Sequence, residues 1–305
     1  MPQRIGVIIP TFHRDTTLQR TLQLLASQTH LPDEVLVVDN AARTSCQALC
    51  EEVALELPFP LTYLAAPENG GPAGATASGM EYFLDRFDDT DWIVRGDDDC
   101  PRVDERHLER VLHACAEASE IHESVGAVGT SGARFDARRA RLTKPGAEPG
   151  LVSVDYLATN RYPFFSVAAI RRVGVFRREL FFGHTEVEFG LRLRRGGYIV
   201  LRLDGPASRR RPVAPSAWAL GEVTWRRFYS VRNQVVLAQE FGDRWATTRV
   251  IASVLGKPLV HMVRNPCLAW RHLRMNTVAV RDALNGRLGR TVEPRVVSGT
   301  LDARG

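Results

Sequence analysis

The chain has 305 residues, of which 44% are hydrophobic and 25% charged, and its formal net charge is +5. This composition is typical of an ordinary globular protein and excludes the disordered and fibrous classes. No apolar run approaches the roughly eighteen residues that a membrane-spanning helix needs. The five cysteines form no CxxC pair and no regular spacing, so we expect reduced thiols and a cytoplasmic protein.

Short β-branched runs alternate with amphipathic stretches at the start of the chain. The runs at residues 5–9, 34–38 and 61–64 predict strands, and helical periods at 16–27 and 47–57 predict helices between them. Apolar strands separated by helices are typical of an α/β protein with a mostly parallel, mixed sheet that helices cover on both faces. In such sheets ligands bind beyond the carboxyl ends of the strands.

Polar residues follow each of these predicted strands and also a further strand at residues 91–95. The candidates for ligand binding are Pro10, Thr11, Arg14, Asp39, Asn69, Gly70, Asp97, Asp98 and Asp99. Because parallel strands end at one edge of a sheet, these residues predict a single polar site there.

Three adjacent acids, Asp97, Asp98 and Asp99, carry the strongest chemical signal. Their carboxylates repel one another unless a cation lies between them, and extended backbone points the first and third the same way. Hard oxygen ligands select Mn²⁺ or Mg²⁺, which leave positions open for substrate phosphates. The alternative is a solvated acidic turn or a helix cap, but the position after a hydrophobic strand favours a metal site.

Two other strand ends suggest a nucleotide. Asp39 is suited to accept a hydrogen bond from a base or a ribose hydroxyl, although a turn aspartate is the alternative. Asn69 and Gly70 precede a helical stretch whose N-terminus favours an anion. The sequence has no GxGxxG and no GxxxxGK[ST] pattern, which argues against dinucleotide and P-loop sites.

The second half of the chain has a mixed pattern. We expect a hairpin at residues 134–144, a mobile loop at 145–150, a helix from His184 to Gly196 and a strand at 198–203. A helical period covers residues 222–240. The apolar spacing beyond it predicts C-terminal helices broken at Gly256 and Pro258.

Charge is concentrated near the C-terminus. Residues 241–290 carry nine Lys or Arg against Asp243 and Asp282 only. Such a run is explained equally well by a solvated helical face and by contact with anionic lipid, a phosphorylated substrate or nucleic acid. Charge alone does not choose between these alternatives.

Five segments in this order resemble the signatures of family 2 glycosyltransferases. They are residues 10–14, 37–40, 69–74, 97–99 and 185–188. Each segment is weak alone, whereas their order and spacing together are specific. The resemblance covers residues 4–240, and an aromatic stretch ending in Arg-Asn at 228–233 is similar to that of galactofuranosyl- and rhamnosyltransferase-like members.

The resemblance implies a GT-A fold with a C-terminal helical segment and an inverting transfer from a UDP- or dTDP-sugar to a hydroxyl. It places Pro10, Thr11 and Arg14 at the nucleotide and Asp39 at the base. It places Asn69, Gly70, Asp97 and Asp98 at the ribose or the diphosphate of the donor. It makes Asp97 and Asp99 the ligands of a bound Mn²⁺ or Mg²⁺.

The resemblance also assigns the acceptor side. Glu186 matches the position of the general base, and Glu188, Arg192 and His184 would lie near the acceptor. Some relatives supply a metal-binding histidine after the strand at 198–203, where this chain has arginines at 209–211. Either water completes the metal shell, or an arginine assists the diphosphate directly.

These assignments predict a glycosyltransferase domain at residues 1–240, with its donor half at 1–130 and its acceptor half at 131–240. A basic helical segment at 241–290 and a flexible tail at 291–305 would follow. The partners expected are a nucleoside diphosphate sugar and a saccharide, a lipid-linked saccharide or a small natural product as acceptor, but no nucleic acid. The basic helices would serve a homodimer or a peripheral contact at the inner face of the membrane.

Two other functions remain open. A non-catalytic sugar-nucleotide-binding or scaffold protein would keep Asp39 and the acidic triplet but would have no use for Glu186. A sugar-1-phosphate nucleotidyltransferase would need a glycine-rich phosphate loop near the N-terminus, which the sequence lacks.

Overall fold

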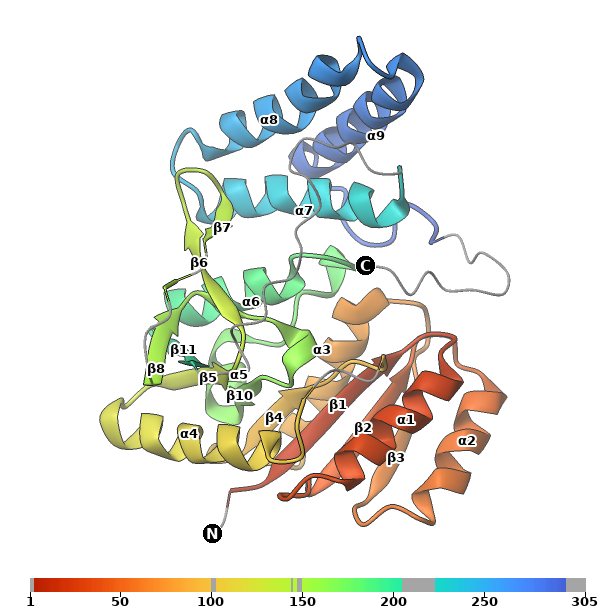
Figure 1. Ribbon diagram of the computed structural model, residues 1–305, viewed down its shortest axis with the longest axis vertical. Coiled ribbons are helices and arrows are strands. Elements are labelled where there is room, and N and C mark those ends of the chain that lie inside the picture. The colour runs from red at the N-terminus through yellow and green to blue at the C-terminus, as the bar shows by residue number, and fades with distance from the viewer. Residues whose placement is uncertain (1–2, 100–102, 144, 147–149, 205–222, 295–305) are drawn as a thin grey trace. The chain divides into compact units, whose positions relative to one another are not determined.

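The computed structural model describes residues 3–99, 103–143, 145–146, 150–204 and 223–294 (Figure 1). They fall into two compact units. Those of the first unit lie within Met1–Asp136, Arg141–Glu179 and Thr185–Arg211, and those of the second within Ala137–Ala140, Leu180–His184 and Pro212–Gly305.

The first unit is built on a mixed sheet with the strand order β3-β2-β1-β4-β10-β5-β11-β8. Strands β3, β2, β1 and β4 are parallel, β10 is antiparallel to both of its neighbours, β5 and β11 are parallel, and β8 is antiparallel to β11. The strands are β1 Ile5–Thr11, β2 Glu34–Asp39, β3 Leu61–Ala65, β4 Trp92–Arg95, β5 Val125–Gly129, β8 Gly150–Val154, β10 Phe164–Ser166 and β11 Ile199–Asp204. The prediction of a mixed, mostly parallel sheet is confirmed.

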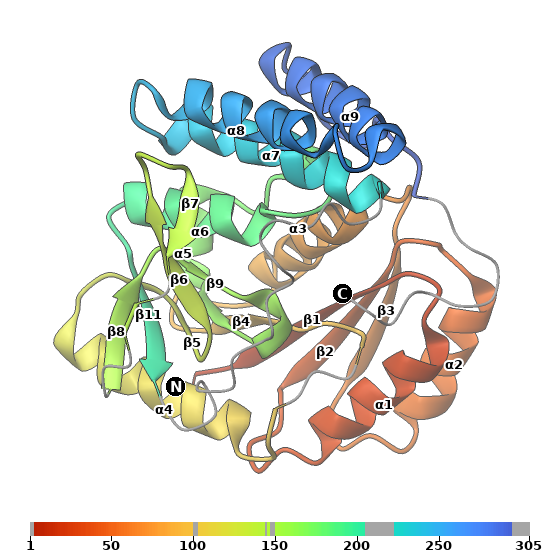
Figure 2. The same ribbon diagram turned by 45° about the horizontal axis from the view of Figure 1, so that its top comes forward.

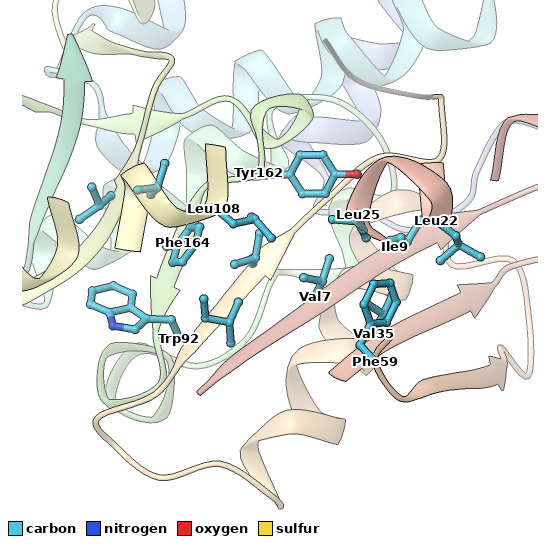
Figure 3. Packing of buried hydrophobic residues seen from close by; sticks show 14 of the residues in the cluster. Val7, Ile9, Leu22, Leu25, Val35, Phe59, Trp92, Leu108, Tyr162 and Phe164 are labelled. Atoms are coloured by element: carbon cyan, nitrogen blue, oxygen red, sulfur yellow. The ribbon is translucent and has the colours of Figure 1, made fainter. Parts of the chain in front are cut away.

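Helices cover both faces of this sheet (Figure 2). One layer contains α1 Asp15–Ala26, α2 Thr44–Ala54 and α4 His107–Ile121, and the other contains α3 Gly71–Leu84, α5 Val167–Val173 and α6 Thr185–Arg195. Because successive strand residues point to opposite faces, Val7 and Ile9 pack with the first layer (Figure 3) while Ile8 packs with the second. The strands are thus buried on both faces, which explains their continuous apolar runs.

A second, three-stranded sheet has the order β7-β6-β9. Its strands are β6 Gly132–Asp136, β7 Arg141–Thr143 and β9 Tyr156–Leu157. The antiparallel pair of β6 and β7 is the hairpin expected from the arginine-rich pattern. Two short 3₁₀ helices, η1 Thr159–Arg161 and η2 Arg178–Leu180, lie between the later elements of the chain.

The second unit consists mainly of α7 Trp225–Phe241, α8 Ala246–His261 and α9 Pro266–Leu284. The prediction of a helix break at Gly256 and Pro258 is wrong, because α8 continues through both residues. Proline lacks the N–H that would bond to the carbonyl of Val254 one turn earlier. The side-chain amide of Asn276 on α9 donates to that carbonyl instead, at 2.6 Å, so the helix loses no buried hydrogen bond there.

A buried histidine begins α4 in the first unit. His107 is 2% exposed and packs edge-on against Tyr162, with their ring centroids 6.3 Å apart. Burial, and then the nearby Arg110 guanidinium, lower the pKa of His107 to about 4. The folded protein therefore holds this imidazole neutral at pH values where an unfolded chain would protonate it.

The stability of the fold should depend on this histidine in mild acid. Its stabilising contribution is fully present above the ordinary pKa of 6.5 and is lost as the pH falls through 4. That loss amounts to up to about 3 kcal/mol. Unfolding midpoints measured between pH 7 and 4 should therefore fall less in His107→Asn than in the parent. His113→Asn, at an exposed position of the same helix, should keep the parental pH dependence, and equal slopes for all three proteins would contradict the assignment.

Candidate active site

The polar strand ends meet at one edge of the main sheet. Thr11 lies opposite Asp39 in the register of β1 and β2, and Asp39 lies opposite Ala65 of β3. On the other side of β1, the backbone N–H of Gly96 donates to the carbonyl of Ile8 at 2.9 Å, which aligns the chain after β4 with the same edge. Residues from three separate loops are thereby brought together.

Asp98 is the buried member of the acidic triplet. Its side chain is 9% exposed and accepts hydrogen bonds from the Thr11 hydroxyl at 2.8 Å and from Arg14 Nη1 at 3.0 Å. Burial raises the pKa of Asp98 to about 6, while the Arg14 guanidinium and the Thr11 hydroxyl act in the opposite direction. These contacts join three of the predicted nucleotide-binding residues in one network.

Asp97 and Asp99 are more accessible than Asp98. Their side chains are 28% and 55% exposed. Asp99 lies 3.7 Å from Arg14, and Asp97 forms an ion pair with Arg95, whose side chain is only 6% exposed. Arg95 is a site residue that the sequence reasoning missed. The only signal for it was a charged residue at the end of the otherwise apolar strand β4.

A glycine before the triplet is required by a close contact. A Cβ atom on Gly96 would lie 2.3 Å from Cε1 of Tyr162, a fully buried ring. Only glycine therefore lets the backbone pass beside this ring. The contact fixes the path of the chain as it enters Asp97.

The outer carboxylates have the chemistry that a hard divalent cation needs. Mn²⁺ and Mg²⁺ prefer carboxylate oxygens and are commonly held by one or two carboxylates together with substrate phosphates. Asp97 and Asp99 fit such a partial shell, while Asp98 is held by protein donors. Within the described part of the chain, no group of three or more His, Cys, Asp or Glu residues is arranged to hold a metal ion. The arginines at 209–211 lie outside the described residues.

Asp39 is fully buried and already supports the local backbone. Its Oδ1 accepts from the N–H of Ala41 at 2.9 Å, and its Oδ2 accepts from the N–H of Arg43 at 2.9 Å and from the Tyr63 hydroxyl at 3.1 Å. A carboxylate has about four lone-pair positions, of which these contacts use three, but the side chain has no exposed surface in this structure. The expected contact with a base remains a prediction.

Three further candidates have backbone roles. Asn69 Oδ1 accepts from the N–H of Gly71 at 3.0 Å, and Gly70 is the N-cap residue of α3. Gly71 has a φ of 66°, which glycine adopts without strain. Pro10 is buried within β1 opposite Val38. These contacts shape the loop and leave ligand binding untested.

Glu186 lies on a different element from the acidic triplet. It is half-buried in the first turn of α6, and the Thr185 hydroxyl donates to its Oε2 at 3.1 Å. One turn later, a Cβ on Gly190 would lie 2.3 Å from the carbonyl of Asp155, so α6 packs closely against that segment. Burial, and then the charge of Glu186, raise the pKa of the neighbouring Tyr156 to about 12.

Glu188 and Arg192 form an internal ion pair on α6. Glu188 is 2% exposed, and Arg192 Nε donates to its Oε1 at 2.7 Å. The same guanidinium donates to the carbonyls of Val173 and Val175 at 2.8 and 2.7 Å. Both side chains thereby fasten the chain after α5 to α6, and an acceptor-side role for them remains a prediction.

The second unit contains a dense polar clamp around the segment Leu180–His184. Asn233 Nδ2 donates to the carbonyls of Leu180, Phe182 and Gly183 at 2.9, 2.9 and 2.8 Å. Arg232 Nη2 also donates to the Leu180 carbonyl, at 3.0 Å. The sequence pattern had singled out this Arg-Asn pair but not its role.

The clamp holds an unusual backbone. Phe181 and His184 have φ values of 59° and 60°, a conformation that residues with a side chain rarely adopt. Such a segment persists only where its surroundings determine it. Ser230 supports it further, with its hydroxyl 3.5 Å from Nε2 of His184, the predicted acceptor-side residue.

Comparison with known families identifies the family of the chain. The family model described as Glycosyl transferase family 2 matches residues 6–176, more than half of the chain, from β1 past the acidic triplet. The chain belongs to glycosyl transferase family 2. The predicted family is therefore confirmed, and a glycosyltransferase is the class of enzyme that it implies.

Similar sequences carry a more specific name. The chain is 31% identical over 213 residues to the galactofuranosyltransferase GlfT1 of two Mycobacterium tuberculosis strains, covering 65% of this chain and 66% of the relative. It is 32% identical over 119 residues to GlfT1 of Mycolicibacterium smegmatis, covering 39% and 37%. The chain thus spans just under two thirds of the length of the first of these relatives.

Solved structures support the fold. The mannosyltransferase PcManGT from Pyrobaculum calidifontis, solved in complex with GDP-Man and Mn²⁺, aligns with a TM-score of 0.56 and 17% identity, over 93% of this chain and 88% of its own. S. aureus TarS 1-349 in complex with UDP aligns with a TM-score of 0.50 and 15% identity, over 93% and 92%. This likeness confirms the expected GT-A fold.

The clamp should contribute strongly to stability. In Asn233→Ala the half-buried carbonyls of Phe182 and Gly183 lose the donor that Asn233 supplies, while the Leu180 carbonyl keeps Arg232, so we expect a loss of about 2 to 4 kcal/mol in the free energy of unfolding. Denaturant unfolding followed by circular dichroism measures it. Gln234→Ala is the matched control, because Gln234 makes one long bond of 3.4 Å to the Ala140 carbonyl. Similar losses in the two variants would contradict a special role for Asn233.

Proposed function

We propose that this family 2 member is an inverting glycosyltransferase that moves a sugar from a nucleoside diphosphate to an acceptor hydroxyl. The acidic triplet after β4 carries the proposal, because it presents two accessible carboxylates beside the ends of β1 and β2. A diphosphate needs cationic neutralisation, and carboxylates provide it through a bound metal ion.

The donor would lie along the sheet edge. Thr11 and Arg14 would border the nucleotide, Asp39 the base, and Asn69 and Gly70 the ribose or phosphate side. Arg14 suits this place, because its guanidinium reaches both Asp98 and Asp99 and remains 26% exposed. This arrangement corresponds to a donor half within residues 1–130 and an acceptor half within 131–240.

Asp97 and Asp99 would hold Mn²⁺ or Mg²⁺. When bound, such a cation neutralises negative charge that develops on the leaving diphosphate. Asp98 would act through the protein, by keeping Thr11 and the backbone of the triplet in place. Arg95 would hold Asp97 from the buried side of β4.

Glu186 would be the general base. Its carboxylate is half-buried in the first turn of α6, so it is partly accessible and could accept a proton from an acceptor hydroxyl. That oxygen then forms a bond to the anomeric carbon while the bond to the diphosphate breaks, which inverts the configuration. Thr185 orients the carboxylate through its hydrogen bond.

The names of the relatives narrow the choice of donor sugar to test first. Their galactofuranosyltransferase name makes a galactofuranosyl residue carried by UDP the first donor to test, ahead of other UDP- and dTDP-sugars. We expect a saccharide, a lipid-linked saccharide or a small hydroxylated compound as acceptor. Release of nucleoside diphosphate with Mn²⁺, measured over a panel of donors, tests the reaction class directly.

A non-catalytic sugar-nucleotide-binding protein is the main alternative. Such a protein would bind the donor through the sheet edge and would release no nucleoside diphosphate with any acceptor. The position of Glu186 at an accessible helix start favours catalysis over this alternative.

The base assignment predicts a clear kinetic effect. Glu186→Gln keeps the shape of the side chain but removes proton acceptance, so turnover should fall at least about a hundredfold. Donor affinity, measured by calorimetry, should change little. Glu117→Gln, at an exposed position of α4, is the control and should retain parental turnover. Retained activity in Glu186→Gln would remove this residue from the mechanism.

The metal assignment predicts a loss that depends on cation concentration. Asp99→Asn removes one charged ligand, so turnover at limiting Mn²⁺ should fall by about a hundredfold and should recover partly at higher Mn²⁺. Chelation with EDTA should abolish parental activity. Asp85→Asn, an exposed acid after α3, should behave like the parent. Full activity in EDTA would instead point to direct neutralisation of the diphosphate by arginine.

A further inference from the structure

The α8–α9 hairpin has an accessible tip that the proposed reaction does not use (Figure 1). One face of α8 is buried through Val250, Val254 and Pro258, and α9 is buried through residues such as Ala269 and Ala279. The connection between the two helices and the turns next to it extend beyond this packed region. Among the described residues, no helix is long and apolar enough to cross a membrane.

The tip exposes large apolar side chains. Leu259 and Val260 in the last turn of α8 are 54% and 71% exposed, and Val263 in the connection is 94% exposed. Trp270 is 60% exposed on α9, about 6 Å along the axis from the start of that helix. Single exposed apolar residues are common, but four at the end of α8, in the connection and at the start of α9 suggest an interaction surface.

The charges at this tip have one sign. Arg264, Arg271 and Arg274 are exposed there, and Lys257 is half-buried in the last turns of α8. The sequence contains no Asp or Glu between Asp243 and Asp282, a stretch with seven Lys or Arg. Exposed tryptophan and valine beside arginine suit the boundary between headgroups and acyl chains, where the apolar groups enter and the cations remain outside.

We propose that the α8–α9 tip binds the surface of a membrane that contains anionic phospholipid. Val260, Val263 and Trp270 enter the headgroup region, and Arg271 and Arg274 pair with lipid phosphates. Charge complementarity selects this partner, because a second copy of the chain would bring the same cationic side chains against one another. The hairpin thus gives the enzyme peripheral contact without a membrane-spanning segment in its described part.

Sedimentation of the full-length protein with vesicles tests this proposal. Binding should be strong to vesicles of phosphatidylcholine mixed with phosphatidylglycerol, weak to phosphatidylcholine alone, and reduced by high salt. Arg271→Glu combined with Arg274→Glu should lower the partition coefficient at least about tenfold. Trp270→Ala should lower it about fivefold or more while leaving unfolding midpoints close to the parent.

Matched variants separate this surface from general effects. Arg20→Glu combined with Arg172→Glu changes the net charge equally at exposed positions of α1 and α5, and should bind vesicles like the parent. Trp245, which is 52% exposed next to Asp243 at the other end of α8, provides the control Trp245→Ala. Equal losses in test and control variants would overturn the proposal. Equal binding to anionic and neutral vesicles would also overturn it. So would light scattering that shows a dimer of the parent and a monomer of Trp270→Ala.

The vesicle assay contains no sugar nucleotide. Its failure would therefore leave the transfer reaction untouched, and a failure of the reaction would leave the lipid contact untouched. Turnover with a soluble acceptor should be equal in Trp270→Ala and the parent, because Trp270 lies outside the residues assigned to donor and base.

Discussion

The buried carboxylate of Asp98 is the interaction on which the polar edge of the sheet depends. Taking a carboxylate out of water is costly, and the Thr11 hydroxyl and the Arg14 guanidinium offset that cost by bonding to its two oxygens. The chain bends at Asp98 and Asp99 rather than continuing as a strand, and the side chains of Asp97 and Asp99 are more exposed than that of Asp98. One inward acid thereby ties the loop after β4 to β1 and leaves two outward acids for chemistry.

Side-chain amides replace backbone donors at two critical places in the second unit. Asn276 bonds to the carbonyl of Val254 that Pro258 leaves without a partner, and α8 stays continuous. Asn233 bonds to the carbonyls of Leu180, at the end of η2, and of Phe182 and Gly183, which lie in neither a helix nor a strand. In both cases the amide nitrogen of a buried side chain donates to backbone carbonyls that would otherwise be left without that donor.

Acidic and basic side chains gather at different places in the structure. Carboxylates gather at the end of the parallel strands, where we propose that a metal and a diphosphate bind, and exposed arginines gather at the tip of the α8–α9 hairpin. The ion pair of Glu188 and Arg192 has a structural role, because Arg192 also binds the carbonyl of Val175 and so holds the chain after α5 against α6. Charged residues that look alike in the sequence thus have different surroundings: some are accessible to a proposed ligand or membrane surface, and others are buried and hold the fold together.

The sequence by itself determined the sheet, its helices and the strand-end residues, because hydrophobic periodicity and the order of motifs are local properties. It also sufficed to name the family. Only the tertiary structure decided which acid of the triplet is buried, that Arg95 pairs with Asp97, and that α8 survives Pro258. The first and the last of these depend on a partner far away in the chain, Thr11 for Asp98 and Asn276 for Val254. A pattern of neighbouring residues contains no information about such partners, since burial and hydrogen bonding arise only when the elements pack.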